Sequence, residues 1–487
     1  MMIKPLAVAV VCLAVTTGYG APLLHTFSSP NSIPYGRFGN ALAVDDQRIY
    51  IVAEANHLGA TLSGTGYAFD RKTFEHVATY PGVQANATVR HIQSNGSDVY
   101  MGSWPGDVDG VDRAGFGAIY DAATGALKYV IENPTPETDE RFGSWAAPLG
   151  TDEWLIGAYK SNDQTPTGGA AFIYSGGELE KTLLDPSPPT AGHADRFGYS
   201  VGSTEDYALV GSYRDSEIVY GAGAVHVYDH AGTYLYSIDN PQPESADLFG
   251  SSLATKAHHA IIGAFDDDGP DVDDVGAVFL YDLDSRELLL RIDNPEPQLE
   301  DKFGFKVAWV GDNIAVGTWD ESEGIGENRV FVFDGVTGEM LEALADPTGG
   351  IGNSFGFELV GVGTDVLVGA DATYSGGQTK AGVAYLFDGS AWLPAPGDAD
   401  HDGAITSSDY LRWAGEFDGT YLRGPADGDF NYDGVANGLD YLIWADAFAH
   451  PQTSVPEPTT AFMALIGSML LFIGRLQSRA VDRAASV

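Results

Sequence analysis

A Phe-Gly pair recurs at a nearly constant interval through most of this chain of 487 residues. Successive pairs are 104, 55, 52, 54 and 52 residues apart, and they begin at Phe38, Phe142, Phe197, Phe249, Phe303 and Phe355. The first interval is about twice the others, so it contains one further unit that has no such pair at the corresponding position. Such a chain must fold as an array of similar units, each burying its apolar face against its neighbours.

Each unit carries three more signatures with the length and alternation of short strands. The second signature ends in a glycine 14 or 15 residues after the phenylalanine, as in LIGA at Gly157 and ALVGS at Gly211; the degenerate unit shows it as VYMGS, ending at Ser103. The third reads GAVHVYD or GAVFLYD, and the fourth is an apolar run ending in Asn-Pro or Asp-Pro. Seven units of four short strands predict an all-β fold, a seven-bladed β-propeller.

The two ends of the repeat region supply the remaining strand. The seventh unit stops after its third strand, at AYLFDG, whereas LLHTFSSP near the N-terminus matches the fourth strand LLLRIDNP in character and in distance from the next Phe-Gly pair. We therefore expect this N-terminal strand to complete the last blade and close the ring, which covers two sheet edges. An open solenoid is the alternative, but a solenoid has no use for the spare strand.

These signatures resemble the FG-GAP repeat, the blade of integrin α-chain propellers and of many exported bacterial proteins, over roughly residues 23–390. In the integrin-type blade, a calcium loop of DxDxDG type lies between the Phe-Gly pair and the later glycine. Here that interval reads GYSVGSTEDYALVG or GFELVGVGTDVLVG, without such a loop. The resemblance therefore implies the fold, while the family's metal sites in the blades are absent from this sequence.

Long and varied loops follow the second strand of most units, and they share one face of a propeller with the returns from each fourth strand. Most of these loops open with an aromatic residue two positions after the strand's glycine, whereas two units have Ala55 and Asp371. The aromatic residues are Trp104, Tyr159, Tyr213, Phe265 and Trp319. They either stack on the rings of a bound carbohydrate or wedge neighbouring blades together.

No motif for catalysis is identified. GYSVG, residues 198–202, matches the nucleophile-elbow pattern GxSxG but opens a strand with no helix after it. There is no HExxH motif, the eleven histidines show no ligand spacing, and the acidic loop over residues 266–274 fits no metal template. The 68 acidic residues outnumber 25 basic ones, for a net charge of −43, which excludes a nucleic-acid partner because phosphate binding needs clustered Lys and Arg. Paired carboxylates of a polysaccharide hydrolase or lyase remain the alternative function.

Beyond the propeller region, one acidic stretch occurs twice, as DADHDGAITSSD and DFNYDGVANGLD. In each copy oxygen ligands fall at loop positions 1, 3, 5, 7 and 12, and a glycine stands at position 6, which is the logic of a calcium loop of the EF-hand type. The expected ligands of the first ion are Asp398, Asp400, Asp402, the Ala404 carbonyl and Asp409. Those of the second ion are Asp429, Asn431, Asp433, the Val435 carbonyl and Asp440.

A helix-like run follows each loop, DYLRWAGEF and DYLIWADAF, with Trp413 and Trp444 at matching positions. Spacings of three and four place the aromatic residues of each run on one helix face, so the two faces should pack together. This arrangement, over about residues 397–450, resembles the dockerin type I duplication. That resemblance implies two calcium ions and a cohesin-like partner module.

The two termini carry export signals. Lys4, an apolar run and TTGYGA have the regions of a secretory signal peptide over residues 1–20, with cleavage before Ala21. The only cysteine, Cys12, lies within it, so the mature chain has no disulfide. Near the C-terminus, VPEP and about sixteen largely apolar residues precede three arginines. This segment, residues 455–487, resembles the PEP-CTERM sorting signal, which implies export, membrane contact through the segment and processing by an exosortase-type machinery.

We therefore predict a signal peptide over residues 1–20, a propeller over 21–395, a dockerin-like module over 396–450, a linker over 451–458 and a sorting signal over 455–487. The expected function is that of an exported protein of the cell envelope or extracellular matrix, which binds an extracellular glycan or protein. A polysaccharide-active enzyme and a purely structural surface protein are the alternatives.

Overall fold

A computed structural model describes residues 21–449, except 55–62, 86, 105, 164–167, 188–193, 270–271, 299–300, 320–327, 350–351, 420–423 and 433. The predicted signal peptide, the sorting segment and Asp433 lie outside the described residues. The chain forms two compact units, one ending at Leu393 and the other beginning at Pro394. Within the described ranges, no helix is both long and apolar enough to cross a membrane.

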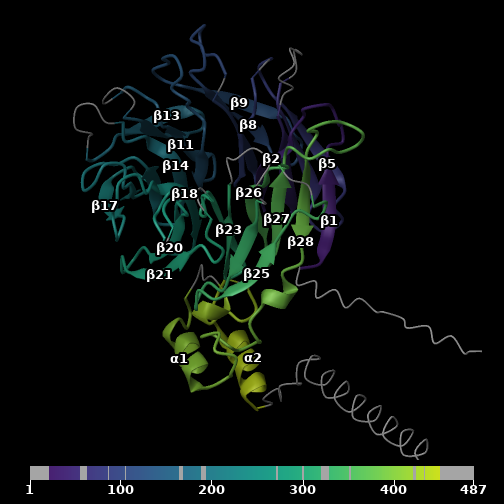
Figure 1. Cartoon of the computed structure of the whole chain (residues 1–487), viewed down its shortest axis with the longest axis vertical. Coiled ribbons are helices and arrows are strands. Elements are labelled where there is room, and N and C mark those ends of the chain that lie inside the picture. Colours follow the sequence, from purple (N-terminus) through teal and green to yellow (C-terminus); the bar gives the residue numbers. More distant parts are fainter. Residues whose placement is uncertain are drawn as a thin grey trace, which may run out of the picture. The chain divides into compact units, whose positions relative to one another are not determined.

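The described strands of the first unit form seven four-stranded sheets, the blades of a β-propeller (Figure 1). Blades 1 to 3 are β2 (Phe38–Val44), β3 (Arg48–Ala53), β4 (Thr65–Asp70), β5 (His76–Pro81); β6 (His91–Ser94), β7 (Asp98–Ser103), β8 (Phe116–Asp121), β9 (Leu127–Glu132); and β10 (Ala146–Gly150), β11 (Glu153–Ala158), β12 (Ala170–Ser175), β13 (Glu178–Leu183). Blades 4 and 5 are β14 (Phe197–Ser203), β15 (Ala208–Ser212), β16 (Ala224–Tyr228), β17 (Tyr234–Asp239); and β18 (Phe249–Lys256), β19 (His259–Ala264), β20 (Ala277–Asp282), β21 (Leu288–Asp293). Blades 6 and 7 are β22 (Lys306–Val310), β23 (Asn313–Gly317), β24 (Val330–Phe333), β25 (Met340–Leu344); and β26 (Phe355–Val362), β27 (Asp365–Ala370), β28 (Val383–Phe387), β1 (Leu23–Ser28).

The ring closes as the sequence predicts. The N-terminal strand β1 pairs antiparallel with β28, with Phe27 opposite Ala384, and becomes the outer strand of blade 7 (Figure 1). Phe27 is only 1% exposed, and its ring packs edge-on against Phe69 of blade 1, with the centroids 5.0 Å apart. The first strand of each blade contacts the first strand of the next, from β2 through β26 and back to β2. The chain is therefore a closed propeller, not a solenoid.

The glycines of the first two signatures meet where neighbouring blades touch. Gly198 of blade 4 has a φ of +84°, and a Cβ built on it would lie 2.3 Å from the Ala170 carbonyl oxygen of blade 3. Gly157 of blade 3 faces the same contact, because its Cβ would lie 2.1 Å from the Gly198 oxygen. Blade 1 has Val52 at the position of Gly157, and blade 2, which it faces, has no Phe-Gly pair before its first strand. Both signatures thus keep two backbones close together.

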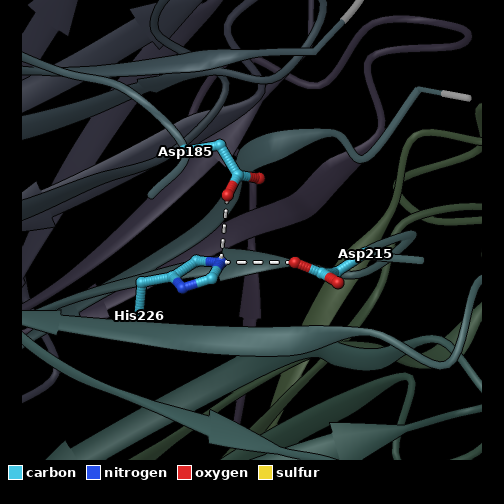
Figure 2. Close-up of side chains that lie close together, drawn as sticks. All are labelled: Asp185, Asp215 and His226. Carbon is cyan, nitrogen blue, oxygen red and sulfur yellow. Dashed lines mark ion pairs between the residues drawn. The ribbon is translucent and has the colours of Figure 1, made fainter. Parts of the chain in front are cut away.

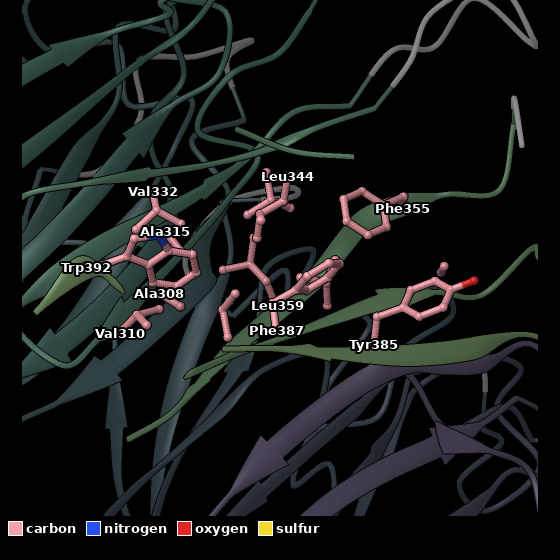
Figure 3. Packing of buried hydrophobic residues seen from close by; sticks show 14 of the residues in the cluster. Ala308, Val310, Ala315, Val332, Leu344, Phe355, Leu359, Tyr385, Phe387 and Trp392 are labelled. Carbon is pink, nitrogen blue, oxygen red and sulfur yellow. The ribbon is translucent and has the colours of Figure 1, made fainter. Parts of the chain in front are cut away.

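The apolar core of the propeller lies between adjacent blades, since each cluster of buried side chains draws on two of them. Figure 3 shows the cluster between blades 6 and 7, which contains Val332 and Leu344 of blade 6 and Phe355 of blade 7. The short helix η1 (Ser390–Trp392) adds the buried Trp392 to this cluster. Burial between blades explains why an isolated repeat could not fold alone.

The second unit contains two helices, α1 (Ser407–Gly415) and α2 (Gly438–Ala449), and a short helix η2 (Pro425–Asp427). An acidic loop precedes each of α1 and α2. The two helices contact each other through their aromatic residues, with Tyr410 5.2 Å from Trp444 and Trp413 5.2 Å from Tyr441 between ring centroids. The aromatic faces predicted from the spacing therefore do pack together.

Candidate functional site

The first acidic loop is held by its own carboxylates. Asp409 is fully buried and accepts hydrogen bonds from the backbone N–H groups of Ala399, at 2.7 Å, and Thr406, at 2.7 Å. The Thr406 side chain in turn caps the N-terminus of α1. Asp398 accepts a bond of 3.0 Å from the N–H of Gly403, whose φ of +81° makes the sharp turn at loop position 6. The loop and the helix start are thereby one hydrogen-bonded unit.

Three of the predicted ligands converge in this loop, because carboxylate oxygens of Asp398, Asp400 and Asp409 lie within 4.8 Å of one another. Asp398 Oδ1 and Asp400 Oδ1 are buried and accept no hydrogen bond from the described residues. Burial raises the pKa of both side chains, and the charge of Asp409 raises each further. Two unbonded oxygens beside a third carboxylate are suited to a hard cation. Asp402 and Ala404 are exposed at the rim, where the Ala404 N–H donates to Asp402.

The second loop repeats this pattern of hydrogen bonds position by position. Asp429 accepts from the N–H of Gly434 at 2.8 Å, and Gly434 has a φ of +84°. Asp440 is fully buried and accepts from the N–H groups of Asn431, at 3.2 Å, and Asn437, at 2.8 Å. The Val435 carbonyl accepts from the Asn437 side chain at 3.1 Å, and Asp433 is not among the described residues. The two loops are therefore built to the same plan.

The two loop–helix halves also bind each other reciprocally. The indole N–H of Trp413 in α1 donates to the Asn437 carbonyl at 2.9 Å, and that of Trp444 in α2 donates to the Thr406 carbonyl at 2.9 Å. Each acceptor is position 9 of an acidic loop and immediately precedes a helix. One hydrogen bond therefore connects each loop to the opposite helix.

Most of the predicted aromatic residues of the propeller's loop face contact the next blade. Tyr159 of blade 3 packs against Tyr199 of blade 4, with the centroids 5.0 Å apart, and Phe265 of blade 5 packs against Phe305 of blade 6, at 5.9 Å. Trp319 contacts Phe357 of blade 7, and Trp104 contacts the guanidinium of Arg141, whereas Tyr213 packs against Tyr199 of its own blade. The wedge interpretation thus describes the contacts of all but Tyr213. Stacking on a carbohydrate stays a prediction.

Carboxylates take the aromatic position in blades 1 and 7. The strand register aligns Val52 with the glycines of the other blades, so the residue two positions later is Glu54, not Ala55 as the sequence comparison predicts. Glu54 and Asp371 are buried, and Arg37 lies between them, 3.7 Å from Glu54 and 3.3 Å from Asp371. Arg90 binds Glu54 at 2.6 Å. Ion pairs therefore replace aromatic packing at this position in blades 1 and 7.

A channel of about 370 Å³ lies among the innermost strands. Lys306 and Glu358 form an ion pair of 2.8 Å on its wall, and the Lys306 ammonium also lies 3.6 Å from the centre of the Trp145 ring. Burial lowers the pKa of Lys306 and raises that of Glu358. His91 lines the same channel, and burial lowers its pKa to about 4. No sequence signature indicates this group, because its four members come from four different blades.

No sequence motif indicates one further cluster, of a histidine and two aspartates. The histidines have no ligand spacing along the chain, yet the fold brings His226 together with Asp185 and Asp215 (Figure 2). The three residues come from the end of blade 3, the loop after β15 and the strand β16. Comparison of the repeats could have indicated this cluster, because His226 stands at the strand position where blades 3, 5 and 6 have phenylalanine.

Fold and sites together define the chain as a seven-bladed β-propeller protein with a C-terminal unit of paired acidic loops. A family model described as FG-GAP repeat matches residues 188–228, which run from the return before blade 4 to the end of β16. Among solved structures, a chain in "Crystal Structure of Mitotic Checkpoint Complex" is similar with a TM-score of 0.50 over 80% of this chain and 98% of that chain, at 9% identity. At that identity the likeness concerns the fold alone. No curated protein matches the chain.

Proposed function

We propose that this is an exported protein of the cell envelope or extracellular matrix, whose propeller binds a glycan or a protein and whose C-terminal unit binds two calcium ions. Three observations support the proposal. The propeller is a rigid ring with its loop variety on one face, an arrangement suited to recognition. The C-terminal unit carries two acidic loops of the same design. The sequence at both ends of the chain has the patterns of export and sorting signals.

The observation that carries the calcium assignment is the matched geometry of the two loops. In each, the position 12 aspartate is buried and accepts backbone N–H bonds from positions 3 and 9, while the position 1 aspartate accepts from the glycine at position 6. Calcium takes about six to eight oxygen ligands at about 2.4 Å, and carboxylates, amide oxygens and backbone carbonyls all serve. We assign the predicted ligand sets of both loops to these two ions.

Calcium titration of the full chain tests this assignment. The protein is first freed of metal with a chelator, which is then removed. We expect titration calorimetry to show that two calcium ions bind to each C-terminal unit. The variant Asp400→Ala should lose the first ion without unfolding, because Asp400 Oδ1 bonds to nothing else that is described. Asp418→Asn is the control, since Asp418 is exposed, outside both loops, and has a φ of +65° that asparagine tolerates. Unchanged binding by Asp400→Ala would contradict the assignment.

The partner of each unit belongs to the same proposal. The dockerin-like duplication favours a cohesin-like module as partner of the C-terminal unit, and the sorting segment favours an exosortase-type machinery that processes the tail. For the propeller, a glycan array with the wild type and with Trp319→Ala tests whether the loop-face aromatic residues bind a sugar. New reducing or unsaturated ends from a polysaccharide panel would instead establish the enzymatic alternative and overturn a purely binding role.

A further inference from the structure

The return from blade 3 to blade 4 differs from its counterparts in charge. In four other returns, an amide and a carboxylate pair with each other; one of them stands before a proline and the other stands two residues before the next Phe-Gly pair. These pairs are Asn133 with Glu140 at 2.5 Å, Asn240 with Asp247 at 2.7 Å, Asn294 with Asp301 at 3.1 Å and Asp346 with Asn353 at 2.8 Å. In the return from blade 3 both positions are aspartates, Asp185 and Asp195, and both are buried.

Blade 4 adds a third carboxylate and an imidazole to this return. His226 Nε2 lies 3.7 Å from Asp185 Oδ1 and 3.7 Å from Asp215 Oδ2, and Figure 2 shows the ring nitrogen directed at both carboxyl groups. The carboxyl groups are themselves oriented by the protein, since the Ser212 hydroxyl donates to Asp185 at 3.1 Å and the Glu217 N–H donates to Asp215 at 2.8 Å. The ligand atoms of the three side chains therefore lie close together, and hydrogen bonds orient the two carboxyl groups.

The Nε2 atom of His226 is placed so that its lone pair can bind a metal ion. The residue is 1% exposed, its Nδ1 lies 2.8 Å from Ser237 Oγ, and its Nε2 has no hydrogen-bond partner among the described residues. A separation of 3.7 Å is too long for a hydrogen bond, but two ligand atoms are about 3 to 4 Å apart when each lies about 2.1 Å from a shared metal ion.

Asp195 adds a further buried carboxylate to this return. Its Oδ1 lacks a hydrogen-bond partner among the described residues, and Asp195 is 1% exposed. Ionised carboxylates are costly to bury unless they are paired or coordinate a metal.

We propose that Asp185, Asp215 and His226 form a binding site for a divalent transition-metal ion of the zinc type, which links blade 3 to blade 4. The imidazole ligand separates this site from the all-oxygen loops of the C-terminal unit, because nitrogen donors favour zinc-type ions over calcium and magnesium. The ion would serve as a staple in a mature chain without cysteine.

The test uses the full chain, freed of metal and then held in excess calcium so that the C-terminal loops are occupied. Zinc is added, and metal content and the melting temperature of the propeller are measured. Two variants restore what other blades have at the same positions, His226→Phe and Asp185→Asn, and should therefore fold. His259→Gln is the control, since His259 is also buried and lies 3.6 Å from a single carboxylate, Asp282.

We expect one zinc per wild-type propeller with a rise in melting temperature, the same result for His259→Gln, and at least a tenfold weaker affinity for both repeat-restoring variants. Cobalt in place of zinc should give visible absorption bands in the wild type that are lost in His226→Phe. The proposal is overturned if His226→Phe binds zinc as the wild type does, if the wild type binds none, or if calcium alone fills the site.

Discussion

The contact between neighbouring blades requires glycine for two separate reasons, a positive φ and a lack of space, and three alanine variants separate them. Gly96, in the turn between β6 and β7, has a φ of +88° but nothing within 4 Å of its Cβ position. Gly157 has no positive φ but would place a Cβ 2.1 Å from the Gly198 oxygen. Gly198 has both constraints, with a φ of +84° and a Cβ 2.3 Å from the Ala170 oxygen.

The expected losses of unfolding free energy follow from these values. Gly96→Ala should cost about 1 kcal/mol, the strain of an L-residue in the left-handed region. Gly157→Ala should cost about 3 kcal/mol, the upper range for overpacking, because backbone rather than a flexible side chain must move. Gly198→Ala combines both and should cost about 4 kcal/mol. Unfolding entropy of about 2.1 cal/mol/K per residue converts each kcal/mol into about 1 °C for a propeller of this size.

Scanning calorimetry of the three variants, at matched calcium concentration, measures these shifts as changes in the melting temperature of the propeller. The order Gly96→Ala, Gly157→Ala, Gly198→Ala in increasing loss is the expected result. If Gly157→Ala were no less stable than Gly96→Ala, the close approach of the two backbones would not be what requires glycine, and the physical account of both repeat signatures would be wrong.

Three further predictions concern the ring and its channel. Phe27→Ala should lower the unfolding free energy by about 3–5 kcal/mol, measured by denaturant unfolding, whereas the exposed Leu24→Ala on the same strand should cost far less; equal effects would contradict closure by β1. Because the pKa of His91 falls to about 4 in the folded state from an ordinary value of 6.5, the unfolded chain binds more protons between these pH values. Its contribution is therefore fully present above pH 6.5 and is lost as the pH falls toward 4, so the stability difference between the wild type and His91→Gln should change across that window, and a constant difference would disprove the prediction. Lys306→Met should cost about 3–5 kcal/mol because it leaves Glu358 buried without its partner, while Lys306→Met combined with Glu358→Leu should cost less than that single change; strictly additive effects would show that the pair is not coupled.

The sequence alone determined the propeller, because the features that specify it are local and repeated. A Phe-Gly pair every fifty or so residues, a glycine at a constant distance after it and alternating apolar strands define one blade. Counting them, with one spare N-terminal strand and one missing at the end, yields seven blades and the closure between β1 and β28. The acidic loops were equally accessible, since all ligands of a calcium loop lie within twelve consecutive positions.

The tertiary structure alone decided which side chains meet between blades. Lys306 and Glu358 lie on the first strands of adjacent blades, and Asp185 reaches His226 only because blades 3 and 4 pack side by side. Residues so far apart in sequence have no spacing rule, because the separation depends on loop lengths that vary without cost to the fold. The alignment of the repeats with one another also required the strand pairing of the sheets, because that pairing places Glu54 at the position that is aromatic in other blades. What the sequence does carry at such sites is a departure from the repeat, an imidazole where other blades have a phenyl ring, and only the packed fold shows which departures face one another.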